Sequence, residues 1–210
     1  MGRNTKDVIL DSAISLFNTK GYSGTSIRDI STKANVNVSN ISYYFQNKRG
    51  LLEYCFTTFF EEYLAEIEKG FHLLSDGATV CLKEITKKIL HFQFQNLQLT
   101  RFILREMSID SQVVREIMST YYVKERYFFK KVFEEGMRTR EFLPLSINYT
   151  IIQYKGLLSM PFLNTFYVSE VLHVFPHEQY FAKKYLQEIN NWIDGVLVNH
   201  ANQRLPIAAK

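Results

Sequence analysis

The sequence predicts an all-α fold of about nine helices. Apolar residues recur at helical spacing along nearly the whole chain. Four prolines and nine glycines among 210 residues are too few for a many-turned β protein, and aromatic residues at 15% supply a large core. We expect a small helical domain over residues 1–46, a larger one over 47–200 and a frayed tail at 201–210.

The first 50 residues predict one long helix followed by two short ones and the start of a fourth. Ile9, Ala13, Leu16 and Phe17 form an apolar stripe that ends at Gly21, a residue type favoured at helix C-termini. A second, shorter stripe covers residues 27–34. Side-chain oxygens that can cap the next three helices occur at Thr25 or Ser26, at Asn37 and at Asn47.

The rest of the chain also follows a helical period, with a break expected between Gly70 and Gly77. Gly156 and Pro161 are expected to bend one of the later helices. Pro176 fits the first turn of the last helix, because proline needs no N–H bond there. The later helices are expected at 79–99, 100–107, 111–136, 145–166 and 175–198.

The positive charge of the chain is concentrated at its beginning. Residues 1–50 hold seven basic and three acidic side chains, whereas the basic and acidic residues of 51–210 cancel, so the whole net charge of +4 lies in the first quarter. A small basic module on a neutral body indicates a polyanionic partner. A solvated surface with a chance imbalance remains the alternative on charge alone.

The second and third helices, joined by a short turn, match a helix-turn-helix unit. In the third helix, Val38, Ile41 and Phe45 are expected to pack inward. Hydroxyl, amide and phenol groups would then face outward, where they could contact base edges and phosphates: Ser39, Asn40, Tyr43 and Tyr44. Phosphates are further expected at the helix N-terminus capped by Asn37 and at Thr25, Ser26, Arg28 and Lys48. A three-helix bundle packed against the body is the structural alternative.

Many positions between residues 13 and 52 resemble the DNA-binding module of the TetR/AcrR family of bacterial regulators. The resemblance implies a TetR-like fold and a homodimer that binds double-stranded DNA with a helix-turn-helix. It rests on Ala13, Leu16, Phe17, Gly21, Tyr22, Thr25, Ser26, Ile27, Ile30, Ala34, Val36, Ile41, Tyr43, Phe45, Lys48, Leu51 and Leu52.

The resemblance implies dimerisation through the last two helices, since two recognition helices must reach grooves about 34–36 Å apart. The interface residues expected from the apolar stripes of these helices are Ile151, Tyr154, Leu158, Tyr185, Ile189 and Trp192. The alternative is that these stripes complete the core of a single chain.

Two kinds of output remain open for the larger domain. A small-molecule pocket is usual in the family, and aromatic side chains could line it: Phe92, Phe94, Phe102, Tyr121, Tyr122 and Phe128. A protein-contact surface is the other kind. Arg101 and Arg105 are neighbours on one helix, Arg115 follows shortly after, and arginine is favoured where proteins bind each other.

Segments 35–45, 99–102, 115–121 and 176–178 resemble more narrowly a TetR-like group of spore-forming bacteria. That resemblance implies binding to short palindromic DNA motifs, an effect on placement of the division ring built by FtsZ, and a role in chromosome positioning during sporulation. It implies a cytoplasmic, nucleoid-associated protein with FtsZ as a partner. A ligand-responsive transcriptional repressor is the alternative function.

No pattern in the sequence predicts catalysis, a metal or a cofactor. His72, Cys81 and His91 lack the close spacing of metal ligands on one element, and His173 and His177 are four apart but have Pro176 between them, which argues against one helix face. Cys55 lies on an apolar stripe and is expected to be a buried thiol. No nucleophile elbow, metalloprotease motif or phosphate-binding loop occurs, and no apolar run reaches the length of a membrane span. We therefore expect neither an enzyme nor a membrane protein.

Overall fold

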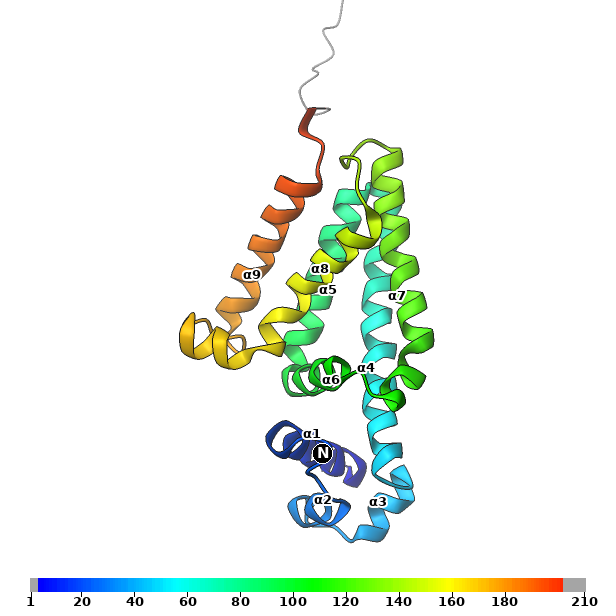
Figure 1. Cartoon of the computed structure of the whole chain (residues 1–210), viewed down its shortest axis with the longest axis vertical. Helices are drawn as coiled ribbons and strands as arrows, with labels where there is room; N and C mark the ends of the chain where they lie inside the picture. Colours follow the sequence, from blue (N-terminus) through cyan, green and yellow to red (C-terminus); the bar gives the residue numbers. More distant parts are fainter. Residues whose placement is uncertain (1–3, 202–210) are drawn as a thin grey trace, which may run out of the picture. The chain divides into compact units, whose positions relative to one another are not determined.

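The structure, a computed structural model, describes residues 4–201 of the chain, and within them it is all-helical as predicted (Figure 1). Short 3-10 or π turns occupy His72–Asp76, Tyr167–Val171 and Ile193–Leu197. The tail expected at 201–210 lies outside the described residues except for Ala201. The α-helices are α1 (Thr5–Lys20), α2 (Ile27–Ala34), α3 (Val38–Phe45), α4 (Lys48–Phe71), α5 (Ala78–Gln95), α6 (Leu97–Ile109), α7 (Gln112–Arg138), α8 (Ile147–Leu163) and α9 (Gln179–Trp192).

The helix ends largely follow the sequence signals. Gly21 ends α1 with a positive φ of 77°, and the break expected before Gly77 is a 3-10 turn. One expectation was wrong: Pro176 does not lie in the last helix, because α9 begins only at Gln179 after a turn. Pro161 lies inside α8.

The described residues form two compact units. The first unit contains the described residues up to Glu62 together with Asn96–Ser119, and the second unit contains Tyr63–Gln95 and the described residues from Thr120 onward. The domain boundary expected at residue 46 stays a prediction. The first unit contains α1, α2 and α3, and also the beginning of α4 and all of α6.

The core of the first unit joins α1 to α6. Phe17 and Phe102 are both fully buried, and their rings stack with centroids 4.8 Å apart. The guanidinium of Arg105 on α6 donates hydrogen bonds to the carbonyl oxygens of Phe17 and Asn18, which is the C-terminal end of α1. A cation at this position satisfies the last carbonyls and complements the helix dipole. The packed rings and the capping bonds together fix α1 against α6.

The core of the second unit is aromatic and contains buried polar contacts. Tyr154 on α8 is fully buried with its ring edge-on to Phe129 of α7, and its hydroxyl lies 2.8 Å from the Thr86 hydroxyl of α5. Glu125 of α7 is also buried, and it accepts a 2.9 Å hydrogen bond from the Tyr63 hydroxyl and an ion pair from Lys155. Cys55 and Cys81, one in each unit, are buried free thiols.

Candidate DNA-binding surface

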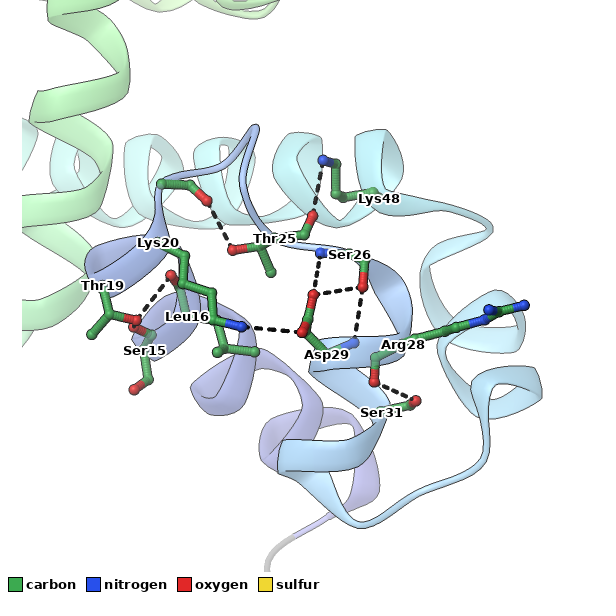
Figure 2. A network of polar contacts seen from close by, with 11 residues as sticks. Ser15, Leu16, Thr19, Lys20, Thr25, Ser26, Arg28, Asp29, Ser31 and Lys48 are labelled. Carbon is green, nitrogen blue, oxygen red and sulfur yellow. Dashed lines mark hydrogen bonds and ion pairs between the residues drawn. The ribbon is translucent and has the colours of Figure 1, made fainter.

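The start of α2 is fixed by reciprocal side-chain bonds. The Ser26 hydroxyl accepts from the Asp29 N–H at 3.1 Å, while the Asp29 carboxylate accepts from the Ser26 N–H at 2.8 Å (Figure 2). Lys20 of α1 lies 3.1 Å from the other carboxylate oxygen. Hydrogen bonds from Ser26 and Lys20 lower the pKa of Asp29 to about 2. Ser26 and not Thr25 is therefore the cap of α2.

The turn between α2 and α3 is also held by side-chain and backbone bonds. Asn35 adopts a left-handed conformation with φ 53°, and its N–H bonds back to the last turn of α2. Asn37 caps α3 as predicted, because its side-chain oxygen accepts from the Ser39 N–H at 3.0 Å. These contacts give α3 a defined start despite its length of only eight residues.

The exposed face of α3 carries aromatic and hydroxyl groups. Tyr43 is 82% exposed, and Tyr44, 38% exposed, lies edge-on against it with ring centroids 5.0 Å apart. Ser39 is exposed and Asn40 is partly exposed. Ile41 and Phe45 are buried, as expected for the inward face.

One residue of the inward face was placed wrongly from the sequence. Val38 is 39% exposed, because it stands in the first turn of α3, where the helix has not yet reached the core. Ser42, one turn further along, is exposed as well. The sequence places Val38 directly after the cap Asn37, and this position in the first turn could have predicted its exposure. The outward face of α3 is thus wider than the periodicity of its apolar residues indicated.

The junction of α3 and α4 is unusually tight. Gln46 has φ 65° and ψ −57°, and the Asn47 N–H donates to the Phe45 carbonyl at 2.7 Å, which makes a three-residue γ-turn. The same carbonyl lies only 2.1 Å from where a side chain at Gly50 would begin. Glycine is therefore required at position 50. The Asn47 side chain accepts from the Gly50 N–H at 3.0 Å and caps α4, as predicted.

Lys48 is bound to the chain itself. Its ammonium donates to the carbonyl oxygens of Tyr22 and Thr25, each at 3.0 Å, and it lies 4.5 Å from the centre of the Tyr22 ring. The Thr25 side chain is only 1% exposed, and its hydroxyl donates to the Gly21 carbonyl at 2.8 Å. Lys48 and Thr25 thus fix the loop between α1 and α2. Arg28 is exposed and extends away from this network (Figure 2).

Arg105 and Arg115, which were expected on a protein-contact surface together with Arg101, form hydrogen bonds within the chain. Arg105 donates hydrogen bonds to the last carbonyls of α1, and its assignment to a partner surface stays a prediction. Arg115 forms a bidentate pair with Asp110, with distances of 3.0 and 2.7 Å. Arg101 is partly exposed on α6.

Half of the residues expected at a dimer interface are buried in the core of the single chain. Tyr154, Leu158 and Ile189 are at most 3% exposed, because they lie on the sides of α8 and α9 that face the second unit's own helices. Ile151, Tyr185 and Trp192 are partly exposed, and the Tyr185 hydroxyl donates to the Leu157 carbonyl at 2.7 Å.

The apolar surface of α8 lies on its opposite side. Exposed apolar residues recur there at intervals of three, eight and three positions, with Gly156 between the second and the third. We call this surface the α8 stripe: Tyr149, Ile152, Gly156, Met160 and Leu163. Exposed apolar side chains continue beyond it at Phe166 and Tyr167.

The comparisons with known proteins decide the family. The family model for bacterial regulatory proteins of the tetR family matches residues 9–55, which include the whole of α2 and α3. The chain is 48% identical over 194 residues to the "Probable HTH-type transcriptional regulator YttP" of Bacillus subtilis, covering 92% of this chain and 94% of that protein. The chain belongs to the TetR family. It is a TetR-type transcriptional regulator, and members of this family bind DNA and are homodimers.

Other relatives agree over shorter stretches or in fold alone. The regulator IcaR of the biofilm operon in Staphylococcus epidermidis is 36% identical over 72 residues, 32% of this chain and 39% of that protein. The regulator PfmR of Thermus thermophilus has a TM-score of 0.75 at 14% identity, covering 91% of this chain and 99% of that one. A tetR-family protein of Rhodococcus RHA1 has a TM-score of 0.72 at 17% identity, covering 94% and 100%.

Neither a metal site nor a membrane-spanning helix is found in the described part of the chain. No group of three or more histidine, cysteine, aspartate or glutamate side chains in residues 4–201 is arranged to hold a metal ion. No helix within the same residues is long and apolar enough to cross a membrane. The homologues are transcriptional regulators and not enzymes.

Proposed function

We propose that the chain binds short palindromic DNA motifs as a homodimer, with α3 inserted in the major groove. The observation that carries the proposal is the exposed face of α3, where Tyr43 is 82% exposed. Base edges would be read by Ser39, Asn40, Tyr43 and Tyr44, and Val38 adds an apolar group that suits a thymine methyl. Two such helices related by a dimer axis require a palindromic site with half-sites one turn apart.

The phosphate contacts fall into two groups in this proposal. Ser26, Arg28 and the N-terminus of α3 at Asn37 approach the DNA backbone, since Arg28 is exposed and the two helix starts present N–H groups. Thr25 and Lys48 contribute indirectly in this proposal, without contacting a phosphate. They fix the loop that carries Ser26, because their polar atoms are bound to backbone carbonyls.

A DNA pull-down from sheared genomic DNA tests whether the exposed face of α3 recognises the base sequence. Tyr43→Ala should abolish enrichment of specific sites, while leaving helix content and dimerisation unchanged. Tyr127→Ala is the matched control, because Tyr127 is a 53% exposed tyrosine on α7 in the second unit and not on α3. Enrichment that persists in Tyr43→Ala would show that α3 is not the reading helix.

The homodimer in this proposal forms through the α8 stripe. Exposed apolar side chains in one helical row are typical of a surface covered by another protein, and Gly156 leaves open space where a second helix can approach. Ile152→Glu should yield a monomer by size-exclusion chromatography with light scattering. Val123→Glu, which alters an equally exposed aliphatic residue on α7, should remain a dimer. A dimeric Ile152→Glu would place the interface elsewhere.

The finer part of the proposal is a role like that of RefZ, a TetR-like protein of spore-forming bacteria. Segments 35–45, 99–102, 115–121 and 176–178 resemble it and support this assignment. In this role the protein binds DNA near the replication origin, regulates placement of the FtsZ ring and helps position the chromosome during sporulation. Arg101 and Arg115 then belong to the surface that acts on the division protein.

The genomic pull-down also tests this role. Sites arrayed around the replication origin, together with a division phenotype of Arg101→Glu that spares DNA binding, are the expected results. Arg105→Glu is unsuitable, because Arg105 caps α1 and its loss would disturb the DNA-binding helices. Sites confined to a few promoters would overturn the division role and favour the ligand-responsive repressor.

A further inference from the structure

A pocket of about 430 Å³ lies in the second unit between one side of α5 and one side of α9. The α5 wall consists of side chains spaced at i, i+3, i+4 and i+7, which is one face of a helix: Glu84, Lys87, Lys88 and His91. Leu90, which is 4% exposed, adds an apolar contact. None of the aromatic side chains considered in the sequence for a ligand pocket lines it.

The facing wall has the same spacing on α9. It is formed by Gln179, Ala182, Lys183 and Leu186, so two polar side chains and two apolar ones alternate along the helix. Near the other ends of the two helices, Lys83 of α5 pairs with Asp194 at 2.6 Å. The pocket is therefore bounded by two helical faces that are held at a defined distance by contacts elsewhere.

Positive charge exceeds negative charge in these walls. Glu84 is shared between the ammonium groups of Lys87 and Lys88, at 3.1 and 3.6 Å. Glu66, the other carboxylate of the lining, is paired with Lys69. Lys183 has no carboxylate within 4.0 Å among residues 4–201. The carboxylates of the pocket are thus already neutralised, whereas an ammonium group remains available to a ligand.

We propose that this pocket binds a small organic carboxylate with an apolar body. The carboxylate would be held by Lys183, and the apolar body would contact Leu90, Ala182 and Leu186. The volume lies in the range of about 300–1,000 Å³ that is typical of small-molecule sites. An ammonium group binds such a headgroup as a point charge and tolerates carboxylates of different shape. The inference goes beyond the DNA-binding function, because every residue that it uses belongs to the second unit.

Isothermal titration calorimetry of the full chain, without DNA, tests the proposal with three probes of equal length. Octanoate should bind with a Kd below 1 mM, one molecule per chain. Octanol, which lacks the charge, should bind at least tenfold more weakly, and octylamine should not bind. Equal binding of octanoate and octanol, or no binding of octanoate below 1 mM, would overturn the proposal.

Two charge reversals on neighbouring residues locate the site. Lys183→Glu should weaken octanoate binding at least tenfold. Lys184→Glu makes the same change one residue along α9, where the side chain pairs with Glu188 at 2.6 Å and does not line the pocket, and it should change binding less than twofold. Equal effects of the two variants would show a general charge effect and overturn the assignment, as would an unaffected Lys183→Glu. Binding is measured without DNA, so either result leaves the DNA-binding proposal to its own test.

Discussion

The two units expose different kinds of surface. The first unit displays Val38, Tyr43 and Tyr44 side by side with serines on α3, a short helix in the basic part of the chain. The second unit displays the α8 stripe, a row of apolar side chains interrupted by a glycine. A mixed polar and aromatic face suits a nucleic acid, whereas an apolar row suits another protein. Each unit therefore exposes the chemistry of a different partner.

The two units also differ in the polar contacts that stabilise each of them internally. In the first unit, single polar side chains tie loops and helix ends to backbone carbonyls, with Lys48 and Arg105 as the main examples. In the second unit, a large aromatic core encloses polar groups such as Tyr154 and Glu125. Both units have an apolar core, but in the first unit the added polar bonds run from side chains to backbone carbonyls at loops and helix ends, whereas in the second unit they join side chains inside the core.

Alkaline pH is expected to have the largest effect on the comparison, because the three buried phenols through which it acts, Tyr63, Tyr154 and Tyr185, all lie in the second unit. Burial raises the pKa of Tyr63 and Tyr154 above the usual tyrosine value and raises that of Tyr185 to about 12. The folded state then retains protons that the unfolded state releases above pH ~10. Stability from these neutral phenols is complete below that pH and is lost as the pH rises through the folded-state values.

Two spectroscopic signals measure this effect. Tyrosinate absorbance should show a late, cooperative step above pH ~10 that coincides with loss of helical circular dichroism. Tyrosine ionisation that runs to completion while the helices persist would contradict the expectation.

Removal of the buried carboxylate should have the largest effect among the substitutions. Glu125→Ala leaves the ammonium of Lys155 and the hydroxyl of Tyr63 without their shared acceptor. Leaving the buried Tyr63 hydroxyl without a partner costs about 1–3 kcal/mol of unfolding free energy. Loss of the ion pair with Lys155, whose side chain is 34% exposed, adds less than it would in a fully buried pair. Urea unfolding measures the loss. Glu188→Ala, which removes an exposed carboxylate on α9, should leave the urea midpoint nearly unchanged, because solvent screens its ion pair with Lys184.

Lys48→Ala should weaken the first unit through its loop. Two charged hydrogen bonds to carbonyls are lost, and each such bond contributes about 1.5–3 kcal/mol, so the unfolding free energy should fall by at least about 2 kcal/mol. Operator affinity should fall with an unchanged salt slope, whereas loss of a phosphate contact would reduce that slope by about 1. Lys69→Ala is the control for removal of a surface ammonium group. A reduced salt slope of operator affinity, with unchanged stability, would show instead that Lys48 contacts a phosphate.

The same glycine substitution should have opposite effects in the two units. In Gly50→Ala the new methyl carbon meets the Phe45 carbonyl oxygen, which the γ-turn holds in place, at a cost of about 1–3 kcal/mol. In Gly156→Ala nothing lies within 4 Å, and alanine favours helix by up to about 1 kcal/mol. Both effects are measured by thermal unfolding. Each glycine variant is made in the monomeric Ile152→Glu chain and compared with Ile152→Glu alone. A stable Gly50→Ala would show that the junction can relax.

Sequence periodicity predicted the helices and the caps Asn37 and Asn47, because these features depend on neighbouring residues. It could not separate the two sides of α8, since Tyr154 and Tyr149 are both aromatic and only the fold decides which one is covered. The contact between Arg105 and the end of α1 joins residues 88 positions apart, so no local pattern could show it. The same holds for Lys48, whose acceptors lie in a loop more than 20 residues earlier.

The smallest expected effect tests whether Val38 belongs to the reading face of α3. If Val38 contacts a thymine methyl, replacing that thymine by deoxyuridine should weaken wild-type binding by about 0.8 kcal/mol, roughly fourfold, which is the contribution of one buried methyl-sized group. The same replacement should have no effect on Val38→Ala, because the contact is already lost, while Ser42→Ala should retain the wild-type sensitivity. This double-mutant cycle isolates the single contact. An equal loss in the wild type and in Val38→Ala at every thymine would show that Val38 is exposed without reading the sequence, and would confine base recognition to the polar side chains and Tyr43.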